Sequence, residues 1–168
     1  DSTNFDTGIL TVSFTAGSHS AEDVLSIRNQ GTGAGEIGVS GANVTYEGVT
    51  IGTFTGGSGG SNLVITLNSN ATPTAVTALV KNITYQNTDT NAPTTGARTV
   101  RFRLTDGDGG TSANYDTTVT VSGVNDDPII TSNGGGATFS TSVAENTTAV
   151  TTVTSTDVDG GTPVYSIV

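Results

Sequence analysis

The sequence predicts an all-β sandwich, and three observations support that fold class. Thr, Val, Gly, Ser and Asn dominate its 168 residues; Thr and Val favour strands, whereas Gly and Asn favour turns. Several stretches alternate apolar and polar residues with the period of two that is typical of half-buried strands. Short clusters of Gly, Asn and Ser separate these stretches, as they do in β-sandwiches.

Four stretches show the alternation most clearly, and each predicts a strand with one buried face. Their inward residues, in chain order, are Leu10, Val12 and Phe14; Leu63, Ile65 and Leu67; Val100, Phe102 and Leu104; and Tyr115, Val119 and Val121. In the third stretch the same alternation turns Arg101 and Arg103 to solvent.

One stretch breaks the strand pattern and predicts a short helix over 73–80, followed by a strand over 82–86. Ala75, Val76, Leu79 and Val80 recur at helical spacing there. Pro73 suits the first helical turn, and Thr72 or Thr74 is a suitable N-cap.

The pattern changes near Val124, where the first predicted domain, 1–124, ends. The segment 125–168 contains a linker and further strand-like stretches after Pro128. About 40 residues bury too little apolar surface to offset the loss of chain entropy, so this segment is not expected to close a sandwich alone.

The charge balance limits the classes of partner that can be expected. Fifteen acidic residues face five basic ones, for a net charge of −10. Nucleic acid needs a basic face, so it is not expected as a partner, and an anionic membrane surface is disfavoured for the same reason. No apolar run is long enough to insert into a membrane. The chain has no Cys, which excludes disulfides and thiolate metal sites.

The acidic residues gather at a few turns rather than along the strands, and this predicts calcium binding. The candidate ligands are Asp106 and Asp108 in TDGDGG, Asn125, Asp126 and Asp127 in VNDDP, Glu145 in VAEN, and Asp157 and Asp159 in TDVDGG. Crowded carboxylates repel, and a divalent ion removes that repulsion. Oxygen ligands on loops without His or Cys suit Ca²⁺, although Asp and Gly also form ordinary turns.

The stretch 125–168 resembles the start of a cadherin-type repeat. VNDDP is similar to the cadherin inter-domain linker, and the run from VAEN through TDVDGG to PVYSIV follows the family pattern. The resemblance implies Ca²⁺ between consecutive domains, held by Asn125, Asp126, Asp127, Asp157 and Asp159. It places Glu145 at the far end, where it would serve the next junction. Asp127 stands where the family usually has Asn.

The stretch 1–124 resembles the bacterial cadherin-like repeats related to chondroitin sulfate proteoglycan repeats. DSTNFDTGILTVSF, AEDVLSI and the long run from ITYQNT to RTVRFRLTDGDGG carry the likeness. It implies an immunoglobulin-like Greek-key sandwich in a large secreted or cell-surface protein of bacteria. It also implies that Asp1 is the second Asp of an Asp-x-Asp turn and a further calcium ligand.

The same resemblance implies that the chain is out of phase with its domains, because the first strands of the first sandwich would precede Asp1. Two explanations stay open. The chain is a window of a tandem-repeat protein whose neighbours are covalent, or it is a filament subunit. In a filament, the strands of one subunit would complete the open sandwich of the next identical subunit.

The predicted function is therefore mechanical: a calcium-rigidified structural or adhesion module outside the cell. The alternative is a carbohydrate-binding module with a polysaccharide partner, which would need an exposed aromatic platform. Most of the nine aromatic residues fall at inward strand positions. An enzyme is not expected, because His19 is the only His and lies in a polar stretch without a nucleophile–base pattern.

Overall fold

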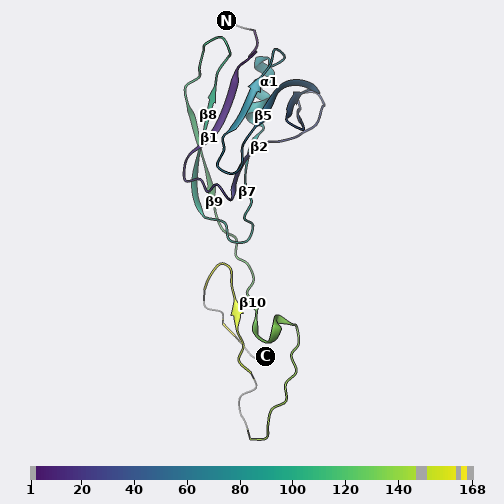
Figure 1. Ribbon diagram of the computed structural model, residues 1–168, viewed down its shortest axis with the longest axis vertical. Coiled ribbons are helices and arrows are strands. Elements are labelled where there is room, and N and C mark those ends of the chain that lie inside the picture. The colour runs from purple at the N-terminus through teal and green to yellow at the C-terminus, as the bar shows by residue number, and fades with distance from the viewer. Residues whose placement is uncertain (1–2, 147–150, 162–163, 166–168) are drawn as a thin grey trace. The chain divides into compact units, whose positions relative to one another are not determined.

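The computed structural model describes residues 3–146, 151–161 and 164–165. The chain divides into two compact units, Asp1–Ser122 and Gly123–Val168. Strands dominate the first unit, which confirms the predicted all-β class (Figure 1).

The first unit is built on one seven-stranded antiparallel sheet with the strand order β3-β4-β5-β6-β1-β8-β9. In that order its strands are β3 (Ile37–Ser40), β4 (Asn43–Tyr46), β5 (Val49–Thr55), β6 (Leu63–Leu67), β1 (Ile9–Ala16), β8 (Gly96–Leu104) and β9 (Tyr115–Val121). A separate pair, β2 (Asp23–Ile27) and β7 (Ile83–Asn87), is also antiparallel. The arrangement is sandwich-like, with a second layer much narrower than the first.

The hydrophobic core lies between the large sheet and this narrow layer. Leu10 of β1 lies opposite Ile65 of β6 on one side and Leu104 of β8 on the other, so one face of three strands is apolar. Leu25 and Ile27 of β2 join the same cluster. The predicted inward positions are confirmed for Leu10, Val12, Leu63, Ile65, Leu67 and Val100, which are buried, and for Phe14, Phe102 and Leu104, which are partly buried.

The predicted helix forms as α1 (Pro73–Lys81) and adds to the narrow layer. The Thr72 side chain caps it by accepting a hydrogen bond from the Ala75 amide at 3.2 Å, and Pro73 occupies the first turn. Ala75, Val76 and Leu79 are buried, which satisfies the helical spacing. Val80 was expected on the same face but is 36% exposed, because α1 covers only part of the sheet.

The prediction for β9 needs one correction. Val119 and Val121 are partly buried as expected, but Tyr115 is 68% exposed. β9 is the outermost strand of the sheet, so its inward face extends beyond the layer that covers the central strands. The alternation gave the correct face for Tyr115 but not its burial.

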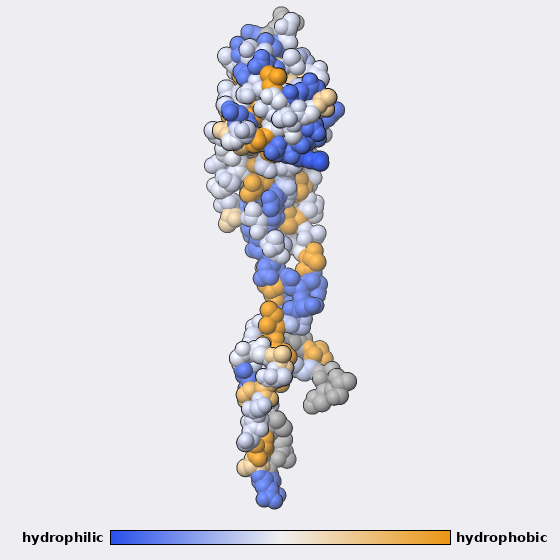
Figure 2. All heavy atoms as spheres, turned by 90° about the vertical axis from the view of Figure 1, so that its right-hand side faces the viewer, coloured by the Kyte–Doolittle hydropathy of each residue, from blue (hydrophilic) through white to orange (hydrophobic). Residues whose placement is uncertain are grey.

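The second unit has little regular structure in its described part. Its strands are β10 (Ile129–Ile130) and β11 (Ser155–Thr156), which pair antiparallel, and a 3₁₀ turn covers Ser132–Gly135. Among its described residues none belongs to the buried core, and apolar side chains lie on its surface (Figure 2). The longer strands expected after Pro128 are absent from the described residues, which agrees with the small apolar surface that the segment can bury.

Candidate metal-binding loops

The first acidic loop joins β8 to β9 and is closed by its own backbone. One carboxylate oxygen of Asp106, Oδ1, accepts hydrogen bonds from the amides of Asp108 and Gly110, both at 2.9 Å. The Asp106 amide donates in turn to the Gly110 carbonyl at 3.2 Å. Asp106 therefore shapes the turn, and Asp108 is left exposed at its tip.

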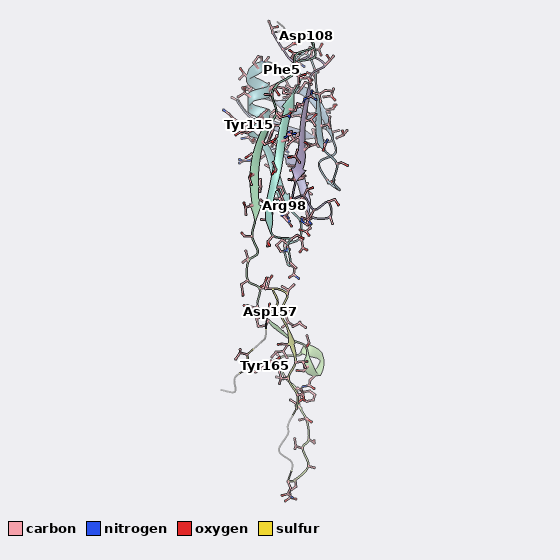
Figure 3. The ribbon with its side chains drawn as sticks, turned by 90° about the vertical axis from the view of Figure 1, so that its left-hand side faces the viewer. Phe5, Arg98, Asp108, Tyr115, Asp157 and Tyr165 are labelled. Carbon is pink, nitrogen blue, oxygen red and sulfur yellow. The ribbon has the colours of Figure 1, made fainter. Side chains whose placement is uncertain are left out.

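Gly107 lets this loop approach the segment that precedes β1. Its φ is +89°, and a Cβ there would come within 2.0 Å of the Asp6 carbonyl oxygen. Asp108 and Phe5 accordingly lie at the same end of the unit, whereas Arg98 lies toward the other end of β8 (Figure 3). The loop thus lies at the end of β9 opposite to Ser122, where the first unit ends.

The second acidic group lies within the second unit and joins the linker to the TDVDGG turn. The Asp126 amide donates a hydrogen bond to the Asp159 carboxylate, although 33 residues separate them. Asp157 Oδ1 accepts from the Asp159 amide at 3.0 Å, and the Asn125 side-chain amide donates to the Asp126 carbonyl at 3.0 Å. Asp126 and Asp157 are partly buried, whereas Asp127 and Asp159 are exposed.

The remaining predicted ligands lie apart from these groups or outside the described part. Glu145 is exposed and belongs to a stretch of the second unit without regular structure. Asp1 lies outside the described residues. Over residues 3–146, 151–161 and 164–165, no three side chains of His, Asp or Glu converge closely enough to hold a metal ion.

A buried ion pair, which the sequence analysis did not identify, fixes the opposite end of the first unit. Arg98 of β8 and Asp23 of β2 are 1% and 2% exposed, and Arg98 Nε lies 3.1 Å from Asp23 Oδ2. The Tyr85 hydroxyl donates to Asp23 Oδ1 and the His19 amide to Oδ2, each at 2.6 Å. The pair joins the large sheet to the β2–β7 layer.

The environment of Asp23 keeps its carboxylate ionised. Burial alone would raise the pKa of Asp23, but the hydrogen bonds from Tyr85 and His19 and the charge of Arg98 outweigh it and lower that pKa. Burial, together with the Asp23 acceptor, raises the pKa of Tyr85. Arg98 also donates to the Gly96 and Thr94 carbonyls, so each of its three side-chain nitrogens makes a hydrogen bond. Among the described residues, no buried side-chain nitrogen or oxygen lacks a hydrogen-bond partner, and this network conforms to that rule.

Glu22 extends the same network to the surface. Its carboxylate accepts from the Thr94 hydroxyl at 2.6 Å, the Thr94 amide at 2.9 Å and the Asn87 side chain at 3.1 Å. These bonds, the Thr94 hydroxyl first, lower the pKa of Glu22 from 4.5 to about 2. Glu22 thus holds the loop before β8 against the start of β2.

In comparisons with protein-family models, curated proteins and solved structures, none matches this chain. Within the described part of the chain, no helix has the length and apolar character that a membrane crossing requires.

Proposed function

We propose that this chain is a calcium-rigidified structural and adhesion module of a bacterial cell surface, built as a cadherin-like Greek-key sandwich. It would serve as a repeat of a secreted or surface protein, or as a subunit of a head-to-tail filament. The observation that carries the proposal is the contact between the Asp126 amide and the Asp159 carboxylate. It supports the idea that the linker and the TDVDGG turn act as one ligand group.

The chemistry of that group favours a hard cation. Asp126, Asp127, Asp157 and Asp159 supply carboxylates, and Asn125 supplies an amide oxygen. The described residues provide no cation to neutralise these carboxylates, because the two ion pairs found there both lie in the first unit. Ca²⁺ takes six to eight oxygen ligands, so backbone carbonyls and further side chains would complete the shell.

The mechanical role follows from electrostatics. Without calcium, the carboxylates of this group repel one another, and few backbone hydrogen bonds hold the described part of the second unit together. With calcium bound, the linker and the turn become one fixed body, and binding to the ordered state stabilises it by mass action. Asp106 and Asp108, with Asp1, would offer a second acidic end to a neighbouring unit, and Glu145 would serve a further junction.

Calorimetric titration of the whole chain with CaCl₂ tests the proposal. We expect heat of binding that MgCl₂ at the same concentration does not reproduce, because Mg²⁺ demands a small octahedral shell. The variant Asp126→Asn/Asp159→Asn should weaken binding. The variant Asp89→Asn/Glu36→Gln removes the same charge outside the acidic loops and should leave it unchanged. Equal binding by both variants would contradict the assignment.

A carbohydrate-binding module remains the second candidate, and one groove favours it. A groove of about 490 Å³ on the first unit is lined by Asn29, Gly31, Thr32, Gly38, Val39, Ser40, Asn43, Thr45, Gly48 and Thr50. Its amides and hydroxyls suit neutral sugars, but it contains no aromatic ring. Pull-down of the chain on insoluble polysaccharides tests this function: retention that Asn43→Ala abolishes would support it, and absence of retention would exclude it for those sugars.

A further inference from the structure

An apolar groove lies open between α1 and the β8–β9 edge of the large sheet. It consists of two adjoining hollows of about 430 and 300 Å³, which share Val80, Lys81 and Leu104. Phe102 and Tyr115 line the larger one, with their rings edge-on at a centroid distance of 6.4 Å. We call this surface the α1–β9 groove. It exposes part of the inward face of the sheet where the narrow layer ends.

The free edge of β9 borders this groove. β9 is the outermost strand, and β8 is its only strand partner among the described residues. Natural sheets protect such edges with charges, Pro or bulges. The β9 sequence YDTTVTV has a single charge, Asp116, and Arg101 of β8 binds it with two hydrogen bonds of 2.7 and 2.8 Å. Its backbone is therefore ready to pair with an additional strand.

The second unit contains a segment with the properties of such a strand. Residues 137–143, ATFSTSV, are exposed and belong to no helix or strand. Phe139, Thr141 and Val143 alternate with polar residues, and the segment carries no charge. Phe139 is 54% and Val143 44% exposed, so each leaves about half of its apolar surface open to solvent.

We propose that residues 137–143 of one copy add as an antiparallel strand to the β9 edge of a second copy and place Phe139 in the α1–β9 groove. In this register Phe139 lies opposite Thr117, and Thr141 opposite Tyr115. Opposite residues share a face, and Tyr115 and Thr117 face the groove, so the apolar side of the added strand does too. The inference deepens the proposed function and rests on it for its filament form.

Charge complementarity selects both the partner and the strand direction. Lys81 lines the groove from the end of α1, and it has no carboxylate partner in the described part of this strongly acidic chain. Glu145 follows Val143 by two residues. Antiparallel addition brings Glu145 to the Ala113 end of the groove, on the side that Lys81 lines. Parallel addition would leave Glu145 at the Val121 end, away from Lys81.

Disulfide trapping tests the register, because the chain has no Cys of its own. One copy carries Thr118→Cys and the other Thr138→Cys; both positions are exposed and lie opposite each other in the proposed register. Their Cα atoms would be about 4.5–5.5 Å apart, within disulfide range. The matched control pairs Thr138→Cys with Ser40→Cys, on the other edge of the same sheet.

We expect the Thr118/Thr138 heterodimer to exceed the Ser40 control by about tenfold or more, and Phe139→Asp to reduce it by a similar factor. Glu145→Lys should reduce it, and adding Lys81→Glu should restore part of the loss. Heterodimer at the level of the Ser40 control would overturn the proposal. So would a Thr118→Cys/Thr138→Cys chain that closes on itself as a monomer at high dilution.

The same mixtures are oxidised with CaCl₂ and with chelator, which separates the two proposals. If the Thr118/Thr138 heterodimer forms above the Ser40 control although the chain binds no calcium, strand addition is supported and the calcium function is refuted. If the chain binds calcium but the heterodimer stays at the level of the control, the calcium function is supported and strand addition is refuted.

Discussion

Replacing Asp23 by Asn tests how the two layers of the first unit are held together. The substitution keeps the shape of the side chain and its acceptor for the Tyr85 hydroxyl, but it removes the charge that faces Arg98. Arg98 is 1% exposed, so its guanidinium would stay buried without a counter-charge. Its acceptors would be the Thr94 and Gly96 carbonyls and the retained Oδ1, 3.4 Å from Nε.

Breaking a buried pair by removing one partner costs about 3–5 kcal/mol, because an uncompensated charge stays in the interior. Domains of this size have unfolding free energies of about 5–15 kcal/mol, so the loss is a large share of the total. With a urea slope of about 2 kcal/mol per molar, the midpoint of unfolding should fall by roughly 2 M. Far-UV circular dichroism at pH 7 measures it. The double variant Asp23→Asn/Arg98→Met should recover part of the loss, since no buried charge remains.

The chain offers a matched control on the same strand. Arg101 and Asp116 also form a two-bond Arg–Asp pair, but their side chains are 37% and 40% exposed. Asp116→Asn should leave the midpoint nearly unchanged, because solvent screens an exposed pair. Equal shifts for Asp23→Asn and Asp116→Asn, or a shift below roughly 0.5 M for Asp23→Asn, would refute the reasoning.

Three further predictions concern local features of the first unit. The lowered pKa of Glu22 means that the unfolded state binds more protons between pH 4.5 and about 2. The contribution of Glu22 to stability is therefore complete above pH 4.5 and is lost as the pH falls toward 2. In the variant Glu22→Gln, the urea midpoint of unfolding should depend less on pH across this window. Thr72→Ala removes the N-cap of α1 and should lower the unfolding free energy by about 1 kcal/mol in urea titrations. Gly57→Ala should lower the thermal midpoint more than Gly59→Ala, because a Cβ at Gly57 meets the Leu25 carbonyl at 2.2 Å and one at Gly59 meets nothing within 4 Å.

Local pattern was sufficient to predict the helix and five strands of the first unit, β1, β6, β7, β8 and β9, but it did not predict β2, β3, β4 and β5. The alternation around Leu10, Ile65 and Val100 marks the buried face because side chains of a strand alternate between two environments. Thr72 and Pro73 mark the helix start through backbone chemistry that needs no tertiary contact. The pattern carries no information on the width of the layer that covers the sheet, so it could not predict that Tyr115 would be exposed.

The buried ion pair had a signal in the sequence that was not used. Arg98 stands two residues before Val100, and Asp23 two residues before Leu25, so both occupy inward positions of their strands. Opposite charges at inward positions indicate a pair, because an isolated buried charge is too costly. That these two strands face each other depends on the fold, which no local pattern supplies.

The acidic loops were recognisable as loops, but their side-chain contacts were not. Asp106 turned out to bond the amides of its own turn, whereas Asp126 and Asp159 meet across 33 residues. Short-range bonds of the first kind follow from Asp-Gly turn chemistry. Contacts of the second kind depend on how the chain folds back through the β10–β11 pair.

Amide hydrogen exchange, followed by mass spectrometry with CaCl₂ and with chelator, tests most directly the claim that calcium orders the second unit. The account predicts that calcium slows exchange in the peptides that cover 123–131 and 154–161, while peptides from β1 and β8 are unchanged. It also predicts that Asp126→Asn/Asp159→Asn abolishes the protection. Exchange that is equal with and without calcium in these peptides, at concentrations that saturate any binding, would contradict the claim.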